Sequence, residues 1–409
     1  MSQIFNIYPK KNKNCLALMF QMWCLSKTCL GGKTLSHCMK FSTNQKWLSE
    51  KRLASDEVEK RKSSVYKNEA IFKSKLLLAK ELKENILFND KRSGLVAINK
   101  PYGLSLLPEE TENVSLTCTL PELASFLEVP EISVIKSPGK FVSGVTLLQT
   151  KQKGQNTQNR VTNCVNRSHA SRIFSTKYLA ITNGIPRNSG VLETVDVTLE
   201  TIKTKQSIKG GTCKEPVIHR ELVSETKLKQ GKKYGKSKDD KTKQTKRISV
   251  VADVLARSRG NTTSLISIQP NSIKWNFLCV YMANLLSPII GDSMFSYRVK
   301  SVLGKPIKVE HQNSPVGYDK NYLSRTILGQ LGITAADEIN LPLHLHHFRT
   351  HLPKFYQNRD LNIYAPLPFY FKRSMESLEI SCNAEELESL DRIVNYNLPK
   401  PNHEINHQS

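Results

Sequence analysis

The stretch Lys136-Ser137-Pro138-Gly139-Lys140-Phe141-Val142-Ser143-Gly144-Val145-Thr146-Leu147-Leu148 decides the fold. Apolar, β-prone residues lead into it at 132–135 and leave it at 145–148. Pro138-Gly139 is a turn signal, because proline fixes φ and glycine tolerates backbone conformations that other residues avoid. The pattern predicts a strand, a tight loop and a second strand. Such a loop either presents side chains to a cleft or simply connects two strands.

A second stretch, Val96-Ala97-Ile98-Asn99-Lys100-Pro101-Tyr102-Gly103-Leu104, lies upstream. It resembles the Val-Asn-Lys-Pro-x-Gly opening of the RluA class of pseudouridine synthases. The corresponding loop of that family reads His-Arg-Leu-Asp-x-x-Thr-Ser-Gly-Leu, and its Asp is the catalytic residue. Ser143-Gly144 match the Ser-Gly of this loop, whereas Gly139 occupies the Asp position. The frame of the family loop is therefore present without its carboxylate.

Further motifs extend the resemblance over about residues 95–371. Tyr178 matches the family Tyr that stacks on the target base, although a strand Tyr is also a common core residue. Residues 273–279 stand where the family has Gly-Arg-Thr-His-Gln-Ile-Arg, and Cys279 replaces the Arg that pairs with the catalytic Asp. Joint loss of the two charges is physically consistent, because an Arg without its anion would be a costly buried charge.

Three C-terminal motifs complete the resemblance. Pro288-Ile289-Ile290-Gly291-Asp292 matches the family's Pro-(Ile/Val)-Leu-Gly-Asp, and we interpret Asp292 as bonding its own turn rather than as a substitute nucleophile. Residues 341–348 and 365–368 resemble the family's Leu-His-Ala strand and its closing Ala-Pro-Leu-Pro. The histidines in and after this strand could suggest zinc, but we predict no metal site because no suitable ligand set lies nearby in the sequence.

The resemblance implies an α+β pseudouridine synthase fold: a mixed, mostly antiparallel sheet flanked by helices, with a basic cleft across it. It implies isomerisation of uridine to pseudouridine in RNA, with no metal or organic cofactor. Within the class, the loop and the Leu-Pro-Leu-His-Leu-His strand are most similar to the animal mitochondrial mRNA branch.

Charge and cysteine content agree with an RNA partner. The 409 residues include 60 Lys and Arg against 36 Asp and Glu, a formal net charge of +24. Such an excess favours nucleic acid or an anionic membrane surface as a partner. Nine cysteines without a Cys-x-x-Cys pair argue against a disulfide framework and a zinc knuckle. No apolar run reaches the ~18 residues of a transmembrane helix, so we predict no membrane insertion.

The N-terminal residues predict targeting. Residues 1–49 contain seven lysines and no acidic residue, which is typical of a mitochondrial transit segment. A secretory signal and an uncleaved tail are the alternatives. Residues 50–92 are predicted to be a charged helical extension, in which Phe72, Leu76, Ala79 and Ile86 recur at helical spacing after a cap at Asn68.

We predict a synthase-like domain over 93–382 and a polar tail over 383–409. Helices of the synthase-like domain are expected at 120–127 and 274–286. A basic insert at about 203–247 is predicted to be disordered, because it has few apolar residues to bury. It carries ten basic and two acidic residues within 227–247. The insert could add phosphate contacts or be a solvated, variable loop.

Two functions remain open from the sequence. Lys100, Lys136, Lys140 and Lys274 are the candidate RNA-binding residues, Tyr178 is the candidate base-stacking residue, and no catalytic residue is matched. The first function is a mitochondrial matrix enzyme that isomerises uridine in mRNA or rRNA with an acid from elsewhere in the cleft. The second is a non-catalytic RNA-binding factor in mitochondrial ribosome assembly or mRNA metabolism, with ribosome assembly factors as partners. A carboxylate close to the Tyr178 hydroxyl would favour the first.

Overall fold

An eleven-stranded sheet is the centre of the computed structural model, which describes residues 74–108, 114–151, 156–203, 212–219, 245–309, 323–356 and 359–382. The chain divides into two units, Met1–Val58 and Glu59–Ser409, and every described residue lies in the second. The predicted transit segment, much of the helical extension, most of the insert and the polar tail lie outside the described residues.

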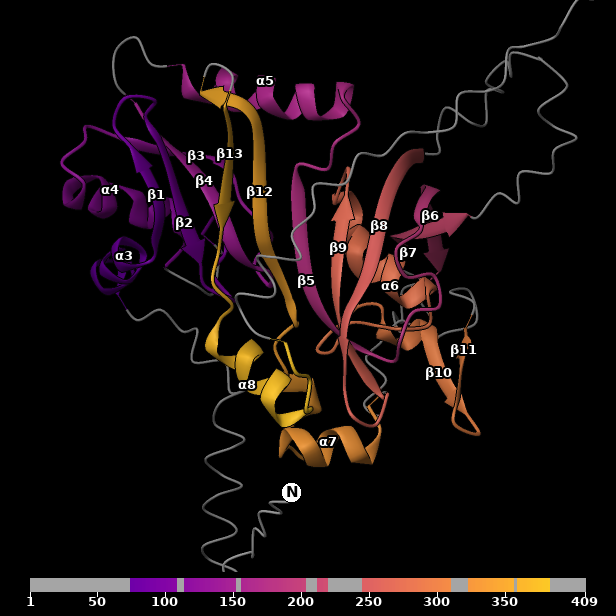
Figure 1. Cartoon of the computed structure of the whole chain (residues 1–409). Coiled ribbons are helices and arrows are strands. Elements are labelled where there is room, and N and C mark those ends of the chain that lie inside the picture. The colour runs from indigo at the N-terminus through magenta and orange to yellow at the C-terminus, as the bar shows by residue number, and fades with distance from the viewer. Residues whose placement is uncertain are drawn as a thin grey trace, which may run out of the picture. The chain divides into compact units, whose positions relative to one another are not determined.

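The sheet combines strands from both ends of the chain (Figure 1). Its order is β1 (Ile86–Asp90), β2 (Leu95–Lys100), β4 (Ser143–Thr150), β12 (Leu345–Tyr356), β5 (Thr176–Asn183), β9 (Thr263–Pro270), β8 (Thr245–Arg257), β6 (Leu192–Lys203) and β7 (Thr212–His219). β3 (Ile132–Lys136) pairs with β4, and β13 (Arg359–Tyr364) pairs with β12. Among these strands only β4 and β12 pair in parallel. The predicted α+β fold with a mixed, mostly antiparallel sheet is confirmed.

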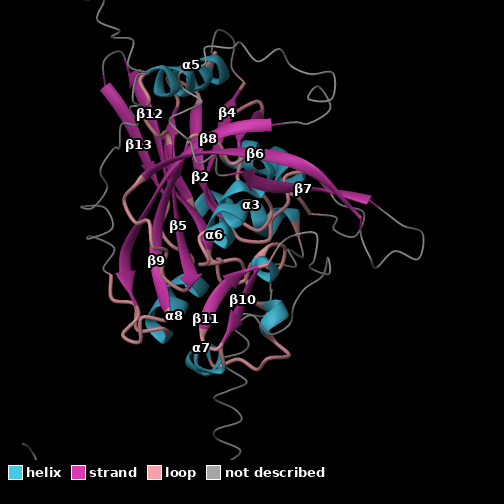
Figure 2. Ribbon diagram, turned by 90° about the vertical axis from the view of Figure 1, so that its right-hand side faces the viewer, coloured by secondary structure: helices cyan, strands magenta, loops and turns pink. Residues whose placement is uncertain are grey.

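Helices cover both faces of the sheet. They are α3 (Lys75–Glu84), α4 (Leu116–Phe126), α5 (Thr157–Ala170), α6 (Phe277–Asn284), α7 (Arg325–Leu331) and α8 (Phe369–Ser377), with 3-10 turns η2 (Lys274–Asn276), η3 (Ser296–Arg298) and η4 (Glu338–Asn340). A separate hairpin joins β10 (Val299–Val302) to β11 (Lys305–Lys308). Figure 2 shows α6 against the strands of the sheet.

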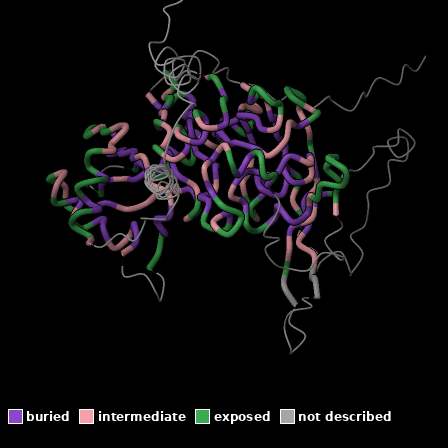
Figure 3. Tube along the Cα trace, turned by 90° about the horizontal axis from the view of Figure 1, so that it is seen from below, coloured by how far each residue is buried: buried purple, intermediate pink, exposed green. Residues whose placement is uncertain are grey.

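The alternation of side chains along β5 explains this two-sided cover. Tyr178 and Ala180 pack in a cluster with α6, whereas Leu179 and Ile181 pack in a cluster with α7 and α8. Successive residues of a strand point to opposite faces, so an unbroken apolar run requires helices on both sides. β2 follows the same rule: Val96 packs with α3 and α4, and Leu95 packs with α5. Figure 3 shows the resulting buried interior in purple, with exposed turns in green around it.

The β4–β12 pair is a narrow junction between the two halves of the sheet. Two residue pairs are in register, His346 with Ser143 and His347 with Gly144. Gly144 has φ +115°, and a Cβ there would lie 2.2 Å from the carbonyl oxygen of His347. Ser143 Oγ is 2.8 Å from His346 Nδ1 and fastens the same junction. Only glycine allows this close approach of the two strands.

The structure corrects three expectations about elements. Ile86 belongs to β1 rather than to the predicted helix, and Leu76 is on the exposed side of α3, whose buried residues are Leu78, Ala79 and Leu82. Asn68 and Phe72 lie outside the described residues. The segment therefore adds a helix and a strand to the domain, which begins before residue 93.

The predicted insert is not unstructured throughout. Thr212–His219 forms β7, which pairs with β6 along its whole length. The lysine-rich composition hid this strand, because an edge strand needs few apolar residues when its backbone is paired on one side.

Candidate functional site

A cavity of about 540 Å³ lies where the two halves of the sheet meet. Its walls come from the β3–β4 loop at 138–142, from β5, from residues 273–279, from the turn at 291–295, and from 339–345, with Tyr102 completing them. Binding sites for small molecules typically have volumes of roughly 300–1,000 Å³. Most of the lining is apolar or aromatic, and Lys140 is the one basic residue among its described members. In this part of the chain the predicted basic cleft is therefore basic at its edge rather than throughout.

The β3–β4 loop presents Gly139 at this cavity. Gly139 is exposed, and a Cβ built on it would meet no atom within 4 Å. The Val142 amide donates to the Gly139 carbonyl at 3.1 Å, which closes the loop as a turn. The position that holds the catalytic Asp in the resembling family is therefore open, in the lining, and has no side chain.

The Lys100 side chain forms hydrogen bonds that position this loop. This side chain is fully buried, and Nζ donates to the carbonyls of Pro101, Leu104 and Lys140 at 3.1–3.3 Å. The Gly103 amide donates to the same Lys140 carbonyl at 3.0 Å. Burial lowers the pKa of Lys100 to about 7. An ammonium engaged in this way is not at the surface, so Lys100 positions the loop rather than contacting a phosphate.

Tyr178 reaches the cavity from β5. Its ring stacks on His347, with centroids 4.7 Å apart and planes at 17°, and the residue is 2% exposed. Burial raises the pKa of Tyr178, so its hydroxyl stays protonated. His347 Nδ1 donates to the Val145 carbonyl at 2.9 Å, and burial, followed by the charge of Lys136, lowers the pKa of His347 to about 3. The tyrosine ring is thus held by a neutral imidazole.

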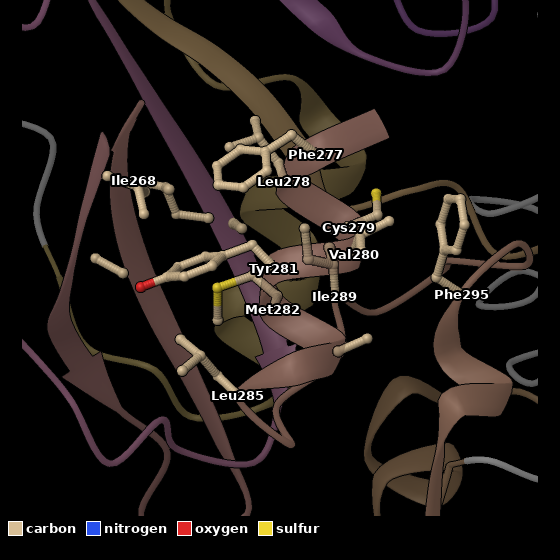
Figure 4. Close-up of a cluster of buried hydrophobic side chains, with 14 of the residues drawn as sticks. Ile268, Phe277, Leu278, Cys279, Val280, Tyr281, Met282, Leu285, Ile289 and Phe295 are labelled. Atoms are coloured by element: carbon tan, nitrogen blue, oxygen red, sulfur yellow. The ribbon is translucent and has the colours of Figure 1, made fainter. Parts of the chain in front are cut away.

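Cys279 and Asp292 form a buried pair in the lining. Figure 4 shows Cys279 on the side of α6 nearer Phe295, whereas Tyr281 points the other way, towards the strand of Ile268. Burial, followed by the charge of the neighbouring Asp292 carboxyl, raises the pKa of the Cys279 thiol. Asp292 Oδ1 accepts from the amides of Met294 and Phe295 at 3.0 and 3.1 Å.

Burial raises the pKa of Asp292 to about 6, despite these hydrogen bonds and the charge of Arg298. Asp292 Oδ2 is also buried and accepts no hydrogen bond from a nitrogen or oxygen donor among the described residues. The turn-bonding interpretation of Asp292 agrees with this geometry. Cys279 occupies the place expected for the pairing Arg, and its thiol contacts this carboxyl.

The segment before α6 departs from the predicted helix. The helix was expected from Lys274, but Trp275 has φ 60° and ψ 40°, and Asn276 has φ 52° and ψ 35°. Two consecutive left-handed residues break the chain direction, so α6 begins at Phe277. Lys274 is exposed between Ile273 and Trp275, and both of these neighbours line the cavity.

The structure brings some of the predicted residues together and separates others. Gly139, Lys140 and Tyr178 line the cavity, and Lys274 adjoins it. Lys136 is not in the lining; it ends β3, half-buried, and burial lowers its pKa. Sequence reasoning missed the aromatic and apolar members of the rim: Tyr102, Phe141, Trp275, Met294 and Ile339. The available signal was the pairing of an aromatic residue with a lysine at 140–141 and 274–275.

The buried histidines have protein partners. His344 Nε2 is 2.7 Å from Ser374 Oγ, His346 Nε2 donates to the Ala365 carbonyl at 3.1 Å, and His351 Nδ1 is 2.8 Å from Asn362 Oδ1. Across the described ranges, no group of three or more His, Cys, Asp and Glu side chains is arranged to hold a metal ion. None of the described helices is long and apolar enough to cross a bilayer.

The fold is that of a pseudouridine synthase. The human RNA pseudouridylate synthase domain containing 4 structure superposes with a TM-score of 0.52 at 23% identity, over 75% of this chain and 98% of that chain. No protein-family model matches the sequence.

Curated relatives agree with this class. Mitochondrial mRNA pseudouridine synthase RPUSD3 of Bos taurus is 29% identical over 293 residues, which span 71% of this chain and 76% of that protein. Pseudouridylate synthase RPUSD4, mitochondrial, of Danio rerio is 29% identical over 325 residues, 76% of this chain and 77% of that protein. The chain is therefore similar in sequence to mitochondrial pseudouridine synthases over about three quarters of its length.

Proposed function

We propose that this protein binds RNA and receives an unpaired uridine in the cavity, without the Asp-dependent chemistry of the RluA class that its sequence resembles. One observation carries the proposal: Gly139, Tyr178 and Cys279, the positions of the family's Asp, Tyr and Arg, line a single cavity. The three positions still share one cavity, but Gly139 and Cys279 replace the charged Asp and Arg of the family. Neither residue supplies a carboxylate or a guanidinium.

The missing step is the one that needs a carboxylate. In the family, the Asp acts either as a nucleophile at the sugar or as a base on its C2′ proton. Among the described residues that line the cavity, Asp292 is the one acidic residue. One of its oxygens is held by two backbone amides, and the other is buried. Neither oxygen is presented to a sugar in this arrangement, which favours binding over isomerisation.

Isomerisation with Asp292 as the acid is the second candidate. Its supports are the place of Asp292 in the lining and a pKa of about 6, close to the working range of a general acid or base. Catalysis by this route needs the turn at 291–295 to move so that Oδ2 reaches the bound nucleotide.

The roles of the candidate residues follow from their positions. Tyr178, buried against His347 but in the cavity lining, forms part of the wall that receives the base. Lys140 and Lys274 contact phosphates at the cavity edge, and Lys136 contributes charge from behind the loop. Lys100 positions the loop. The proposed location is the mitochondrial matrix, supported by the names of the relatives and by the basic, acid-free residues 1–49. The proposed ligand is mitochondrial mRNA or rRNA, during mRNA metabolism or ribosome assembly with its assembly factors.

Full-length protein, uridine-containing RNA and two readouts test the proposal. Fluorescence anisotropy measures binding, and chromatography of nucleosides from the digested RNA measures isomerisation. We expect binding without pseudouridine from the unmodified chain. Pseudouridine that disappears in Asp292→Asn but not in Ser293→Ala would establish the second candidate instead. Absence of RNA binding at low salt would refute both.

A further inference from the structure

We infer that Trp275 and Phe141 form two stacking platforms at the cavity mouth, which hold the nucleotides flanking the bound uridine and select unpaired RNA. This inference rests on the proposed function and adds the residues and the RNA class that function leaves open.

The first observation is a cluster of apolar side chains that the fold leaves exposed. Phe141 is 49% exposed, Met294 56% and Ile339 51%, and all three line the one cavity. Trp275 is half-buried beside them and packs on the core cluster around α6. Single exposed apolar residues are ordinary, but several around one hollow indicate a binding surface.

The second observation is that each aromatic platform has a cation beside it. Lys140 Nζ lies 5.6 Å from the centre of the Phe141 ring. Lys274 is exposed next to Trp275. Burial, followed by the charge of Lys274, lowers the pKa of Lys246, and Lys246 Nζ donates to Ser272 Oγ at 2.7 Å. Aromatic faces for bases with lysines for phosphates are the pattern of single-stranded nucleic-acid binding. A purely apolar peptide would gain nothing from these charges.

The third observation is how Trp275 is held. A left-handed backbone is unfavourable for tryptophan, and glycine would adopt it freely. The next residue, Asn276, is also left-handed, and its Nδ2 contacts Met294 Sδ at 3.8 Å. The indole is thus fixed at the mouth at the expense of backbone strain, a feature that clusters at ligand sites.

These features together determine selectivity. Stacking on Phe141 and Trp275 needs bases whose faces are free, which duplex RNA does not offer. Loops and single strands should therefore bind more tightly than the same sequence in a duplex.

Trp275 can report on its own contact. The chain has three tryptophans, and the other two are Trp23 and Trp47. In the full chain carrying Trp23→Phe and Trp47→Phe, a short uridine-rich single strand should quench the remaining emission. In the same background, Trp275→Ala should weaken binding by about 5- to 150-fold with an unchanged slope of log K against log salt. Trp275→Phe, which keeps a ring, should retain most of the affinity.

Leu303 is the matched control. It is 98% exposed in the turn between β10 and β11 and does not line the cavity, so Leu303→Ala should bind RNA as the parent does. If anisotropy shows RNA binding while the emission is constant and Trp275→Ala binds like Leu303→Ala, the inference is overturned and the proposed function stands. Equal affinity for single strand and duplex would overturn it as well. If no RNA binds the parent protein, the proposed function itself fails. Should Trp275→Ala melt at a lower temperature, the quenching and Trp275→Phe remain decisive.

Discussion

Two glycines of the β3–β4 region show how different the requirements on one residue type can be. At Gly144 the backbone is left-handed and the partner strand leaves no room, whereas at Gly139 a Cβ would meet open space. Gly144 is thus required by the fold. Gly139 is not, because the space beside it would admit a side chain.

The two sites predict opposite outcomes for the same substitution. Gly144→Ala should lower the free energy of unfolding by about 2–5 kcal/mol, because strain and overlap add. Gly139→Ala should change it by no more than about 0.5 kcal/mol. Urea denaturation of both variants measures the contrast, and similar losses at the two sites would contradict the described junction of β4 and β12.

Asp292 predicts a pH dependence of stability. Its pKa is raised from 3.8 to about 6 in the fold, so the native state binds the proton more tightly than the unfolded chain. The resulting stabilisation is complete below pH 3.8 and is lost as the pH rises through about 6. It amounts to about 3 kcal/mol.

Asp292→Asn keeps an oxygen for the two amides and removes the titration. Relative to this variant, the parent should lose stability as the pH rises from 4 to 7, as measured by urea denaturation at several pH values. If the free energy of unfolding depends on pH in the same way for the two proteins, the pKa of Asp292 is not raised by folding.

At the scale of elements, most of the sheet could be predicted from apolar runs. Residues 132–135 and 145–148 were expected as strands, and β3 and β4 include them. The break before α6 could not be predicted, because tertiary contacts hold Trp275 in a conformation that local propensity disfavours. β7 was missed for a related reason, since it is stabilised by pairing rather than by composition.

The site was predictable only in part. Sequence motifs assigned Gly139 and Tyr178 to one cleft, and both residues line the cavity. They could not reveal that Lys100 points inward or that Lys136 is outside the lining, because the direction of a side chain depends on the packing of distant loops. The aromatic rim follows no motif at all.

The hydrogen bonds of Lys100 Nζ lead to a prediction about the β3–β4 loop. Lys100→Met removes the donor shared by three carbonyls, so the loop should loosen and RNA affinity should fall. The salt slope should be unchanged, because no phosphate contact is lost. Lys274→Gln should instead reduce the slope by about 0.7, the value for one phosphate on a single strand. Anisotropy titrations at several salt concentrations distinguish the two variants. A reduced salt slope for Lys100→Met would show that Lys100 contacts a phosphate.

At the scale of the whole molecule, one stretch of the sequence is dense in charge. Residues 220–244 carry nine basic and four acidic residues. They connect β7 to β8, which flank β6: His219 and Arg247 both pair with Asp196. The two strands are therefore about 9–10 Å apart, a distance that a short linker spans.

Replacing residues 220–244 with a short Gly/Ser linker should leave the melting temperature nearly unchanged. The slope of log K against log salt should shrink by about 0.7 for each phosphate contact removed. A linker of equal length with Gln at every basic position is the matched control for chain length. An unaltered slope in both variants would mean that the insert takes no part in RNA binding.

The narrow junction of β4 and β12 has a consequence for the cavity that it borders. Residues 138–142 approach from one half of the sheet, and Tyr178 with 273–295 approaches from the other. A nucleic acid that contacts both walls links the two halves of the sheet across the β4–β12 junction. Separating the two halves would then require the nucleic acid to dissociate. The stiffness of the sheet at this junction should therefore depend on whether the cavity is occupied.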